Sequence, residues 1–559
     1  MKKFSLVVFL SLLFIPIFSG GRDFCEEQLD RGIRNSEAYS YFLIEKSRAN
    51  PSQKEEMLKE ALRCSPDLPA VYFELAKANF SPSGGRMYKA YDYMLGGIEA
   101  YKRNFWWTFM LAGSLFLGLI ISFVFSMFII IIIRLMRDLP LLTHDIMERK
   151  KRMLLLFIVI ISAFGGPLLL MGSILIVLGL YLKKADRSVV YLYLLFLFLS
   201  PWLVKASSIV FNIPSSSVLK AVVEVNESRD NRYALSVLNN FSKDEAVLSS
   251  YALALRREGH YDEAIEIYNK LIARNPDPAL YNNLANCYVA KDDLEKAIQC
   301  YQQSIQIKPL VSAYYNMSQV LRRTLDLVKG EEYFLYAQKM DPDAITGFQA
   351  VFSQNPNRLV VDEVLPIPAL WEYSYSREKA ARVSAFGLSI LPPSRLPVLA
   401  VFIGALFYVL NKRMRARAYR CKKCGTIICN KCVRRVLWGN MCLRCYKSLI
   451  ELHELDARER ITRLKTVYDY QMRRRRILKV LSFLLPGSAY IYAGFVLKGF
   501  FMLWLFLFFL MAFIISSIFV IGMPYFPHLW LNWGAPFLLV LVFLVSNIIT
   551  QMRLAKGWL

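Results

Sequence analysis

The sequence predicts a mainly α-helical, polytopic membrane protein that carries helical-repeat modules and a small cysteine-rich insert. Hydrophobic residues make up 55% of its 559 residues, and the mean hydropathy is +0.33, which is too apolar for an ordinary soluble protein. Several apolar runs are long enough to cross a bilayer and alternate with polar stretches. One polar stretch repeats every 33 residues, and another contains three Cys-x-x-Cys pairs.

The N-terminal region predicts an exported helical module. Residues 1–21 combine Lys2 and Lys3 with an apolar run and small residues, a pattern typical of a signal peptide or signal anchor. In residues 22–104, apolar and small residues recur at three- and four-residue steps, which predicts a degenerate module of helical hairpins. We therefore expect this module to be extracytoplasmic. Its cysteines, Cys25 and Cys64, could be core thiols or, in an oxidising compartment, a disulfide; the same choice applies to Cys287 and Cys300.

Residues 105–204 predict transmembrane segments. The run 109–133 is long enough for one span and ends at Arg134 and Arg137. The run 153–182 is interrupted by Gly165-Gly166-Pro167, so it could be one tilted helix or a short hairpin, and the basic residues that follow favour the hairpin. The run 189–204 crosses next.

Residues 205–395 predict a soluble repeat domain with core repeats at 244–343. Three sets of residues recur 33 positions apart: Pro276, Pro309 and Pro342; Ala264, Ala297 and Gly330; Tyr268, Tyr301 and Phe334. Each unit pairs two helices that approach at the small residue. This pattern resembles the tetratricopeptide repeat (TPR), and residues 58–76 resemble a worn copy. The resemblance implies a TPR-like α-solenoid, and we expect it to be joined to the membrane helices. Residues 358–371, which contain two prolines, read as an extended segment over the last repeat.

A solenoid of this kind presents a concave groove that binds a peptide or a partner helix. The first helix of each unit supplies the wall, and six residues on these helices are candidate partner-binding residues. They are Tyr281, Asn282, Asn286, Tyr314, Tyr315 and Asn316. The tyrosines could instead pack between helices.

The region 412–447, after a predicted transmembrane segment at 396–411, predicts a zinc-knuckle module. Its six candidate metal ligands are Cys421, Cys424, Cys429, Cys432, Cys442 and Cys445. A tetrahedral zinc needs four thiolates, and the first and third pairs can supply them because 17 residues separate the two pairs. The middle pair could complete a second site with His453, remain free, or exchange with the outer pairs. Zinc thiolates require a reducing compartment, so we expect this module in the cytoplasm.

A basic charged helix is predicted at 448–479 and a C-terminal membrane hairpin at 480–559. Between Asn411 and Val480 the chain has 21 Lys and Arg against five Asp and Glu. This charge favours contact with anionic lipid and orients the chain, whereas nucleic-acid binding is the weaker interpretation. The order of the modules is similar to that of bacterial membrane-bound TPR proteins with a Cys-rich, zinc-binding insert, and this resemblance implies no particular activity.

No catalytic residues are predicted. The four histidines are scattered over different modules, and we find no phosphate loop, nucleophile elbow or paired acids. We therefore expect a non-enzymatic scaffold in a bacterial inner membrane, with protein partners in the groove, the lipid bilayer as a second partner, and no small-molecule substrate. The alternatives are a zinc- or redox-responsive membrane sensor and a nucleic-acid-binding membrane protein. Another alternative topology keeps the repeats in the cytoplasm.

Overall fold

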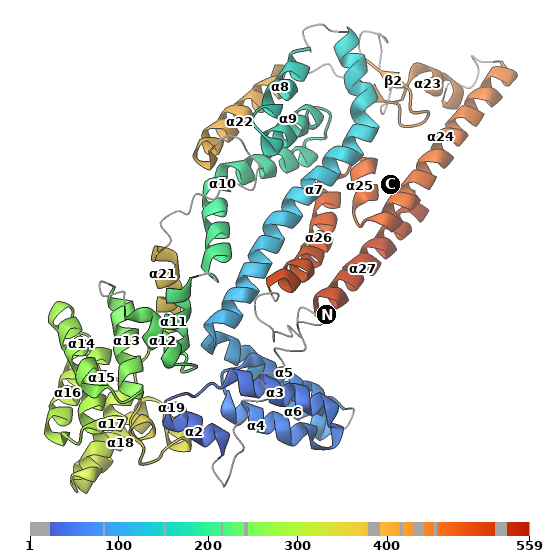
Figure 1. Ribbon diagram of the computed structural model, residues 1–559. Coiled ribbons are helices and arrows are strands. Elements are labelled where there is room, and N and C mark those ends of the chain that lie inside the picture. Colours follow the sequence, from blue (N-terminus) through green and yellow to red (C-terminus); the bar gives the residue numbers. More distant parts are fainter. Residues whose placement is uncertain are drawn as a thin grey trace, which may run out of the picture. The chain divides into compact units, whose positions relative to one another are not determined.

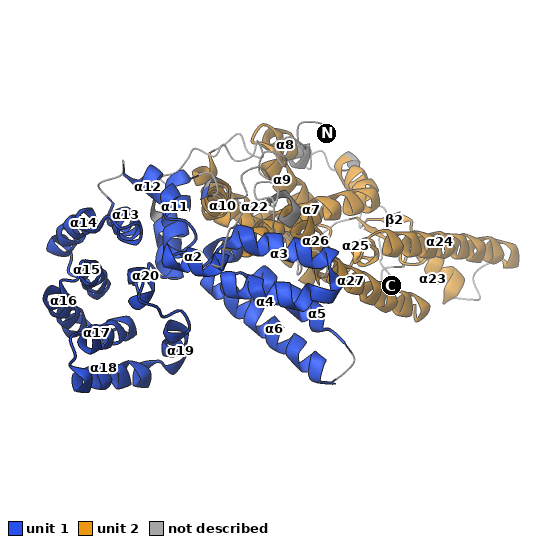
Figure 2. Cartoon of the chain, turned by 60° about the horizontal axis from the view of Figure 1, so that its bottom comes forward, with its two compact units in different colours: residues 1–108, 213–377 blue, residues 109–212, 378–559 orange. Residues whose placement is uncertain are grey.

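The computed structural model describes residues 23–81, 84–148, 153–213, 216–239, 244–377, 392–413, 418–429, 441–450, 456–519 and 534–557. The chain forms two compact units (Figure 2). Unit 1 joins the residues up to Thr108 to Ile213–Arg377, and unit 2 joins Phe109–Asn212 to the residues from 378 onward. The predicted leader at 1–21 lies outside the described residues.

Unit 1 begins with the N-terminal module, which is helical as predicted. Its elements are α2 (Phe24–Asp30), α3 (Glu37–Ala49), η1 (Pro51–Gln53), α4 (Lys54–Cys64), α5 (Pro69–Asn79) and α6 (Gly84–Arg103). In Figure 1 these helices lie together in the blue part of the ribbon, with α3 packed on α4 and α5 on α6. Leu58, Leu68, Val71 and Leu75 are completely buried between them.

The rest of unit 1 is the repeat domain. Its helices are α11 (Ser217–Asn226), α12 (Arg232–Leu238), α13 (Glu245–Arg257), α14 (Tyr261–Arg274), α15 (Pro278–Ala290), α16 (Leu294–Ile307), α17 (Val311–Arg323), α18 (Leu327–Met340), α19 (Pro342–Ala350), α20 (Pro356–Leu359) and α21 (Ile367–Arg377). The pairs α13–α14, α15–α16 and α17–α18 are the three predicted repeats. Ala264, Ala297, Tyr268 and Tyr301 are completely buried, as a small contact residue and its neighbouring aromatic residue should be.

The three repeats turn between their helices at equivalent positions, 33 residues apart. Gly259, Asp292 and Leu325 all have positive φ angles of 91°, 65° and 65°. Glycine adopts this left-handed conformation freely and Asp tolerates it, but a leucine pays a steric cost. The third copy also has Gly330 at the helix contact, where an added Cβ would lie 2.9 Å from Arg322 Cγ.

Polar contacts join the N-terminal module to the repeat domain within unit 1. Arg358 lies 2.6 Å from Glu26 and 3.3 Å from Asp30. Asn35 donates to the carbonyl of Glu227 at 2.8 Å, and the buried Arg229 lies 3.0 Å from Glu37. The two modules are therefore parts of one unit, although the sequence separates them by about a hundred residues of apolar chain.

Unit 2 contains the apolar helices. They are α7 (Phe105–Glu148), α8 (Met153–Ala163), α9 (Pro167–Gly179), η3 (Ala185–Arg187), α10 (Ser188–Asn212), η5 (Pro393–Arg395), α22 (Leu396–Arg413), α25 (Ser488–Ala493), α26 (Val496–Phe519) and α27 (Ala535–Ala555). Among the described residues, five helical stretches are long and apolar enough to cross a membrane: 105–146, 185–211, 393–413, 496–515 and 536–555. The run 153–182 forms a pair of short helices that break at Gly166, whose φ is 103°.

The first apolar helix is longer than the sequence predicts. A crossing that ends at Ile133 was expected, but α7 continues to Glu148. Arg134 and Asp138 form a buried ion pair one turn apart. Arg134 and Arg137 also donate to the carbonyls of Ile491 and Tyr492. These contacts satisfy the charges inside the protein, so the helix need not end where they begin.

The Pro-Gly-Ser stretch before α26 makes a tight backbone crossing. Gly487 and Gly494 have φ angles of 80° and 95° and bracket α25. An added Cβ at Gly487 would lie 2.2 Å from the carbonyl oxygen of Gly499. Only glycine permits this approach, which accounts for the glycines of the motif.

The left-handed turn of the third repeat yields a stability prediction. Leu325→Gly should stabilise α17 and α18 against local opening by about 1 kcal/mol, because it relieves the steric cost of a non-glycine residue at positive φ. Leu325 is 83% exposed, so the substitution removes little packing. Hydrogen–deuterium exchange of the detergent-solubilised protein measures the effect. Gly259→Leu at the equivalent turn should act in the opposite direction, and faster exchange in Leu325→Gly would contradict the explanation.

Candidate functional site

The groove of the repeat domain is occupied by the chain itself. Residues 360–365, which we call the strap, follow α20 and run in extended conformation past α17, α15, α13 and α11. These are the first helices of the repeats and of the pair before them. In Figure 2, α20 lies inside the curve formed by the repeat helices, next to α15. The predicted extended segment at 358–371 is therefore present only in part, because its first residues belong to α20 and residues from Ile367 onward form α21. The non-helical stretch between these helices lines the groove rather than covering only the last repeat.

Asparagine side chains bind the main chain of the strap at Val361. Asn316 accepts a hydrogen bond from the Val361 amide at 2.7 Å and donates to its carbonyl at 2.8 Å. Asn286 and Asn282 donate to the same carbonyl at 3.0 and 3.1 Å. All three side chains are completely buried. Three of the six predicted partner-binding residues thus converge on the main chain of one residue, Val361.

The same arrangement continues along the strap at every second residue. Asn283 accepts from the amide of Glu363 and donates to its carbonyl, both at 2.8 Å. Asn226 accepts from the amide of Leu365 at 2.8 Å. A period of two is that of an extended strand, so the amide side chains of successive helices take the place of a neighbouring strand.

One side chain of the strap has its own binding site. The Asp362 carboxylate lies 2.7 Å from Arg256 and 3.1 Å from Arg257, and it accepts from Asn286 at 2.9 Å. Arg256 is completely buried and Arg257 nearly so. Burial works to raise the pKa of Asp362, but the two guanidinium groups outweigh it, so the pKa of this carboxyl is lowered from its usual value. The carboxylate is therefore held in the charged state.

The predicted tyrosines lie elsewhere. Tyr315 is buried against Phe348, with ring centroids 5.3 Å apart, and Tyr314 packs near Tyr333. Both therefore pack between helices, the alternative left open above, whereas Tyr281 is half-buried on α15.

Sequence reasoning missed four residues of the groove: Asn226, Asn283, Arg256 and Arg257. A signal for Asn283 existed, because it is the equivalent of Asn316 one 33-residue repeat earlier. The two arginines gave no such signal, since their carboxylate partner is more than 100 residues away.

The second candidate site is a cluster of four cysteines in unit 2. Cys421, Cys424, Cys442 and Cys445 place their sulfur atoms within 4.8 Å of one another. The sulfur atoms of Cys424 and Cys442 are 3.6 Å apart. Four sulfurs at about 2.3 Å from a tetrahedral zinc would lie about 3.8 Å apart, so the cluster fits this ion. The amides of Cys442 and Cys445 each donate to a sulfur at 3.3 Å, which stabilises thiolates.

Local structure explains how the cluster forms. Strands β1 (Tyr419–Arg420) and β2 (Ile427–Ile428) pair in antiparallel fashion and carry the first cysteine pair in their turn, while α23 (Leu443–Leu449) begins at the second pair. Gly425 in the turn has a φ of 77°, and an added Cβ would lie 2.3 Å from the ring of Tyr470. Tyr470 and Gln471 belong to α24 (Ala457–Leu484), and Gln471 donates to the carbonyls of Lys422 and Lys423. The basic helix therefore packs on the knuckle.

The middle cysteine pair does not join this cluster in the described part of the chain. Cys429 is buried beside Leu141 and Ala418. Cys432 lies outside the described residues, as does His453, so the alternatives for a second site stay predictions.

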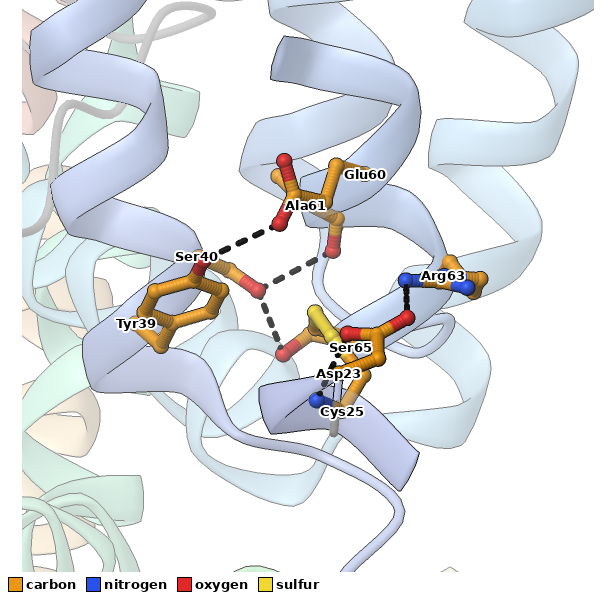
Figure 3. Close-up of a disulfide and its surroundings, with 9 residues drawn as sticks. Asp23, Cys25, Tyr39, Ser40, Glu60, Ala61, Arg63 and Ser65 are labelled. Carbon is orange, nitrogen blue, oxygen red and sulfur yellow. Dashed lines mark hydrogen bonds and ion pairs between the residues drawn. A yellow bond between two sulfur atoms is a disulfide. The ribbon is translucent and has the colours of Figure 1, made fainter. Parts of the chain in front are cut away.

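The N-terminal module contains a disulfide. Cys25 and Cys64 are bonded, with their Cα atoms 5.2 Å apart, and fasten α2 to α4 (Figure 3). Arg63 pairs with Asp23 beside the bond, and Ser40 donates to the carbonyl of Ala61 at 3.0 Å. Of the two alternatives for these cysteines, the structure has the disulfide. Cys287 and Cys300 instead remain thiols in the core of the repeats, and burial raises the pKa of Cys287 to about 12.

Comparisons with known proteins identify the repeats. Residues 245–287 and 278–309 match two family models, each described as a tetratricopeptide repeat. The mitochondrial import receptor subunit TOM70 of Saccharomyces cerevisiae, in strains YJM789 and ATCC 204508 / S288c, is 36% identical over 77 residues. This match covers 12% of this chain and 12% of TOM70. Residues 245–309 thus form tetratricopeptide repeats, which confirms the prediction from the 33-residue spacing.

Proposed function

We infer that this protein is a membrane-embedded, non-catalytic scaffold that binds partner proteins as extended segments in its repeat groove. The main-chain hydrogen bonds from the groove asparagines to the strap carry this proposal, because they recognise an extended polypeptide independently of most of its side chains. The similarity to a receptor subunit agrees with a partner-binding role for the repeats.

The proposed topology places the repeat domain on the same side of the membrane as the N-terminal module. A disulfide favours an oxidising, extracytoplasmic compartment for that module. The two modules belong to one unit, so the chain between Thr108 and Ile213 must cross an even number of times. The helices α7 and α10 supply two crossings. Since α8 and α9 have only 11 and 13 residues, we place them as a hairpin that enters and leaves on one side.

The cysteine cluster is proposed to bind one zinc ion in the cytoplasm of a bacterial cell. The helix α22 would carry the chain inward, where the Lys and Arg residues of 411–480 face anionic lipid. Cys421, Cys424, Cys442 and Cys445 would hold the ion, and a site closed by four thiolates stabilises a small fold rather than activating water.

The partner-binding role can be tested with groove variants of the full chain. Asn283→Ala combined with Asn316→Ala, both made in an Asp362→Asn background that weakens the strap's own hold on the groove, removes at least four hydrogen bonds that the groove can form with a bound main chain. At about 1 kcal/mol each, partner recovery should fall by about tenfold or more. Quantitative mass spectrometry of proteins co-purified from native membranes measures this. The matched control, in the same background, is Gln302→Ala with Gln303→Ala on the exposed side of α16. Equal recovery with both double variants would refute the scaffold role.

The topology predicts which sites an impermeant reagent can reach. Gln302→Cys in the repeat domain should gain labelling by a membrane-impermeant maleimide in intact cells, above the background of the native cysteines. Lys465→Cys on the exposed face of α24 should gain labelling only after permeabilisation. If Gln302→Cys also requires permeabilisation, the repeats are cytoplasmic and the proposed topology is wrong.

Metal analysis distinguishes a four-ligand site from a six-cysteine arrangement. Purified protein should contain about one zinc per chain, as expected for one tetrahedral site. Cys421→Ser or Cys442→Ser should lose this zinc, whereas Cys429→Ser should keep it, because Cys429 is outside the cluster. Elemental analysis by mass spectrometry gives the stoichiometry. Two zinc ions per chain, or zinc loss in Cys429→Ser, would show that the middle pair contributes ligands.

A further inference from the structure

We propose that the strap is a displaceable ligand of the chain's own groove, and that it imitates the partner segment the groove accepts. That segment is an extended stretch of a partner protein in which two aliphatic residues precede an acidic residue. This inference rests on the proposed function and specifies its partner.

The groove recognises both the main chain and one side chain of the segment that it binds. Main-chain recognition at Val361, Glu363 and Leu365 requires an extended segment with free amides at alternate positions, and any sequence without proline at these positions can supply them. Side-chain recognition falls on Asp362, which meets two buried arginines. A segment with a neutral residue at this position would leave those charges uncompensated, at a large cost in free energy.

The aliphatic requirement comes from the residues beside the aspartate. Val360 is 3% exposed and packs with Leu359 against Val289 and Val320 of α15 and α17. Val361 contacts the cluster around Tyr315. On the other side of Asp362, Val364 is 38% exposed, so the C-terminal half of the strap is less firmly buried.

The contacts that hold the strap are of a kind that a partner segment could replace. It forms no helix or strand of its own, and its docking contacts are side-chain hydrogen bonds, ion pairs and a few aliphatic residues. A cavity of about 580 Å³ lies beside it in unit 1, lined by strap residues and by residues of the N-terminal module such as Arg34 and Arg103. Room therefore exists next to the strap for it to move or for a partner segment to enter.

The N-terminal module anchors the strap just before the groove. Arg358 reaches Glu26 and Asp30 on α2, which the Cys25–Cys64 disulfide fastens. Asn357 donates to the carbonyls of Asp30 and Arg257, both at 2.9 Å. Weakening this anchor should release the strap without changing any residue that contacts a bound segment in the groove.

The test measures binding of a fluorescent peptide with the sequence of residues 359–365 to the detergent-solubilised full chain. The wild-type protein should bind weakly, because the apparent Kd rises as the fraction of open grooves falls. Asp362→Asn removes the charge that binds the strap to Arg256 and Arg257, so more grooves should be open. This variant should bind the peptide at least about tenfold more tightly than the wild-type protein does. A control peptide that has Asn at the position equivalent to Asp362 should bind Asp362→Asn no more tightly than it binds the wild-type protein. Asn283→Ala with Asn316→Ala, added to Asp362→Asn, should abolish binding.

A second variant protects the test against misfolding of Asp362→Asn. Arg358→Ala leaves the groove intact and should also tighten binding of the peptide. Hydrogen–deuterium exchange of residues 360–365 reports in both variants whether the strap has left its site. If exchange stays slow and no peptide binds, the strap is a permanent part of the fold and this inference is wrong. If exchange becomes fast and still no peptide binds, the groove does not accept extended segments and the proposed function fails as well.

Discussion

The ion pair of Asp362 with Arg256 and Arg257 is the contact on which the arrangement of the repeat domain depends. Two guanidinium groups buried in one groove are costly unless a carboxylate balances them. Asp362, more than 100 residues away from the two arginines in the sequence, supplies that carboxylate. This ion pair holds the strap in the groove, where it passes four helices. The groove asparagines then satisfy the strap's main chain, which a buried extended segment requires.

This constraint links the groove to the N-terminal module. The residues just before the strap bind α2, and a disulfide fastens α2 to the remaining helices of that module. The residues just before the strap therefore form polar contacts with both the repeat domain and the N-terminal module. A partner that displaced the strap would move a segment that is bound to both. Such a connection would give the proposed scaffold a physical means to couple partner binding in the groove to the packing within unit 1.

The two units differ in the chemistry of their cysteines. Unit 1 contains a disulfide, whereas the described cysteines of the cluster in unit 2 form a set of four sulfurs suited to a metal ion. Disulfides and zinc thiolates are stable in opposite redox environments. In the proposed topology, the N-terminal module and the cysteine cluster face opposite sides of the membrane, so each chemistry has its own compartment.

Local signals in the sequence determined the repeat helices and the four-cysteine pairing. The 33-residue spacing of Ala264, Ala297 and Gly330 reflects a contact made within each unit, and the Cys-x-x-Cys pairs close within 25 residues, so short-range patterns suffice. Only the tertiary structure decided that α7 extends to Glu148, that Cys25 pairs with Cys64 and that residues 360–365 fill the groove. Each of these features depends on a partner that is distant in the chain, such as Ile491 for Arg134 and Arg256 for Asp362. A charge or a main-chain group can be buried only where another group compensates it, and short-range sequence patterns do not reveal which group that is.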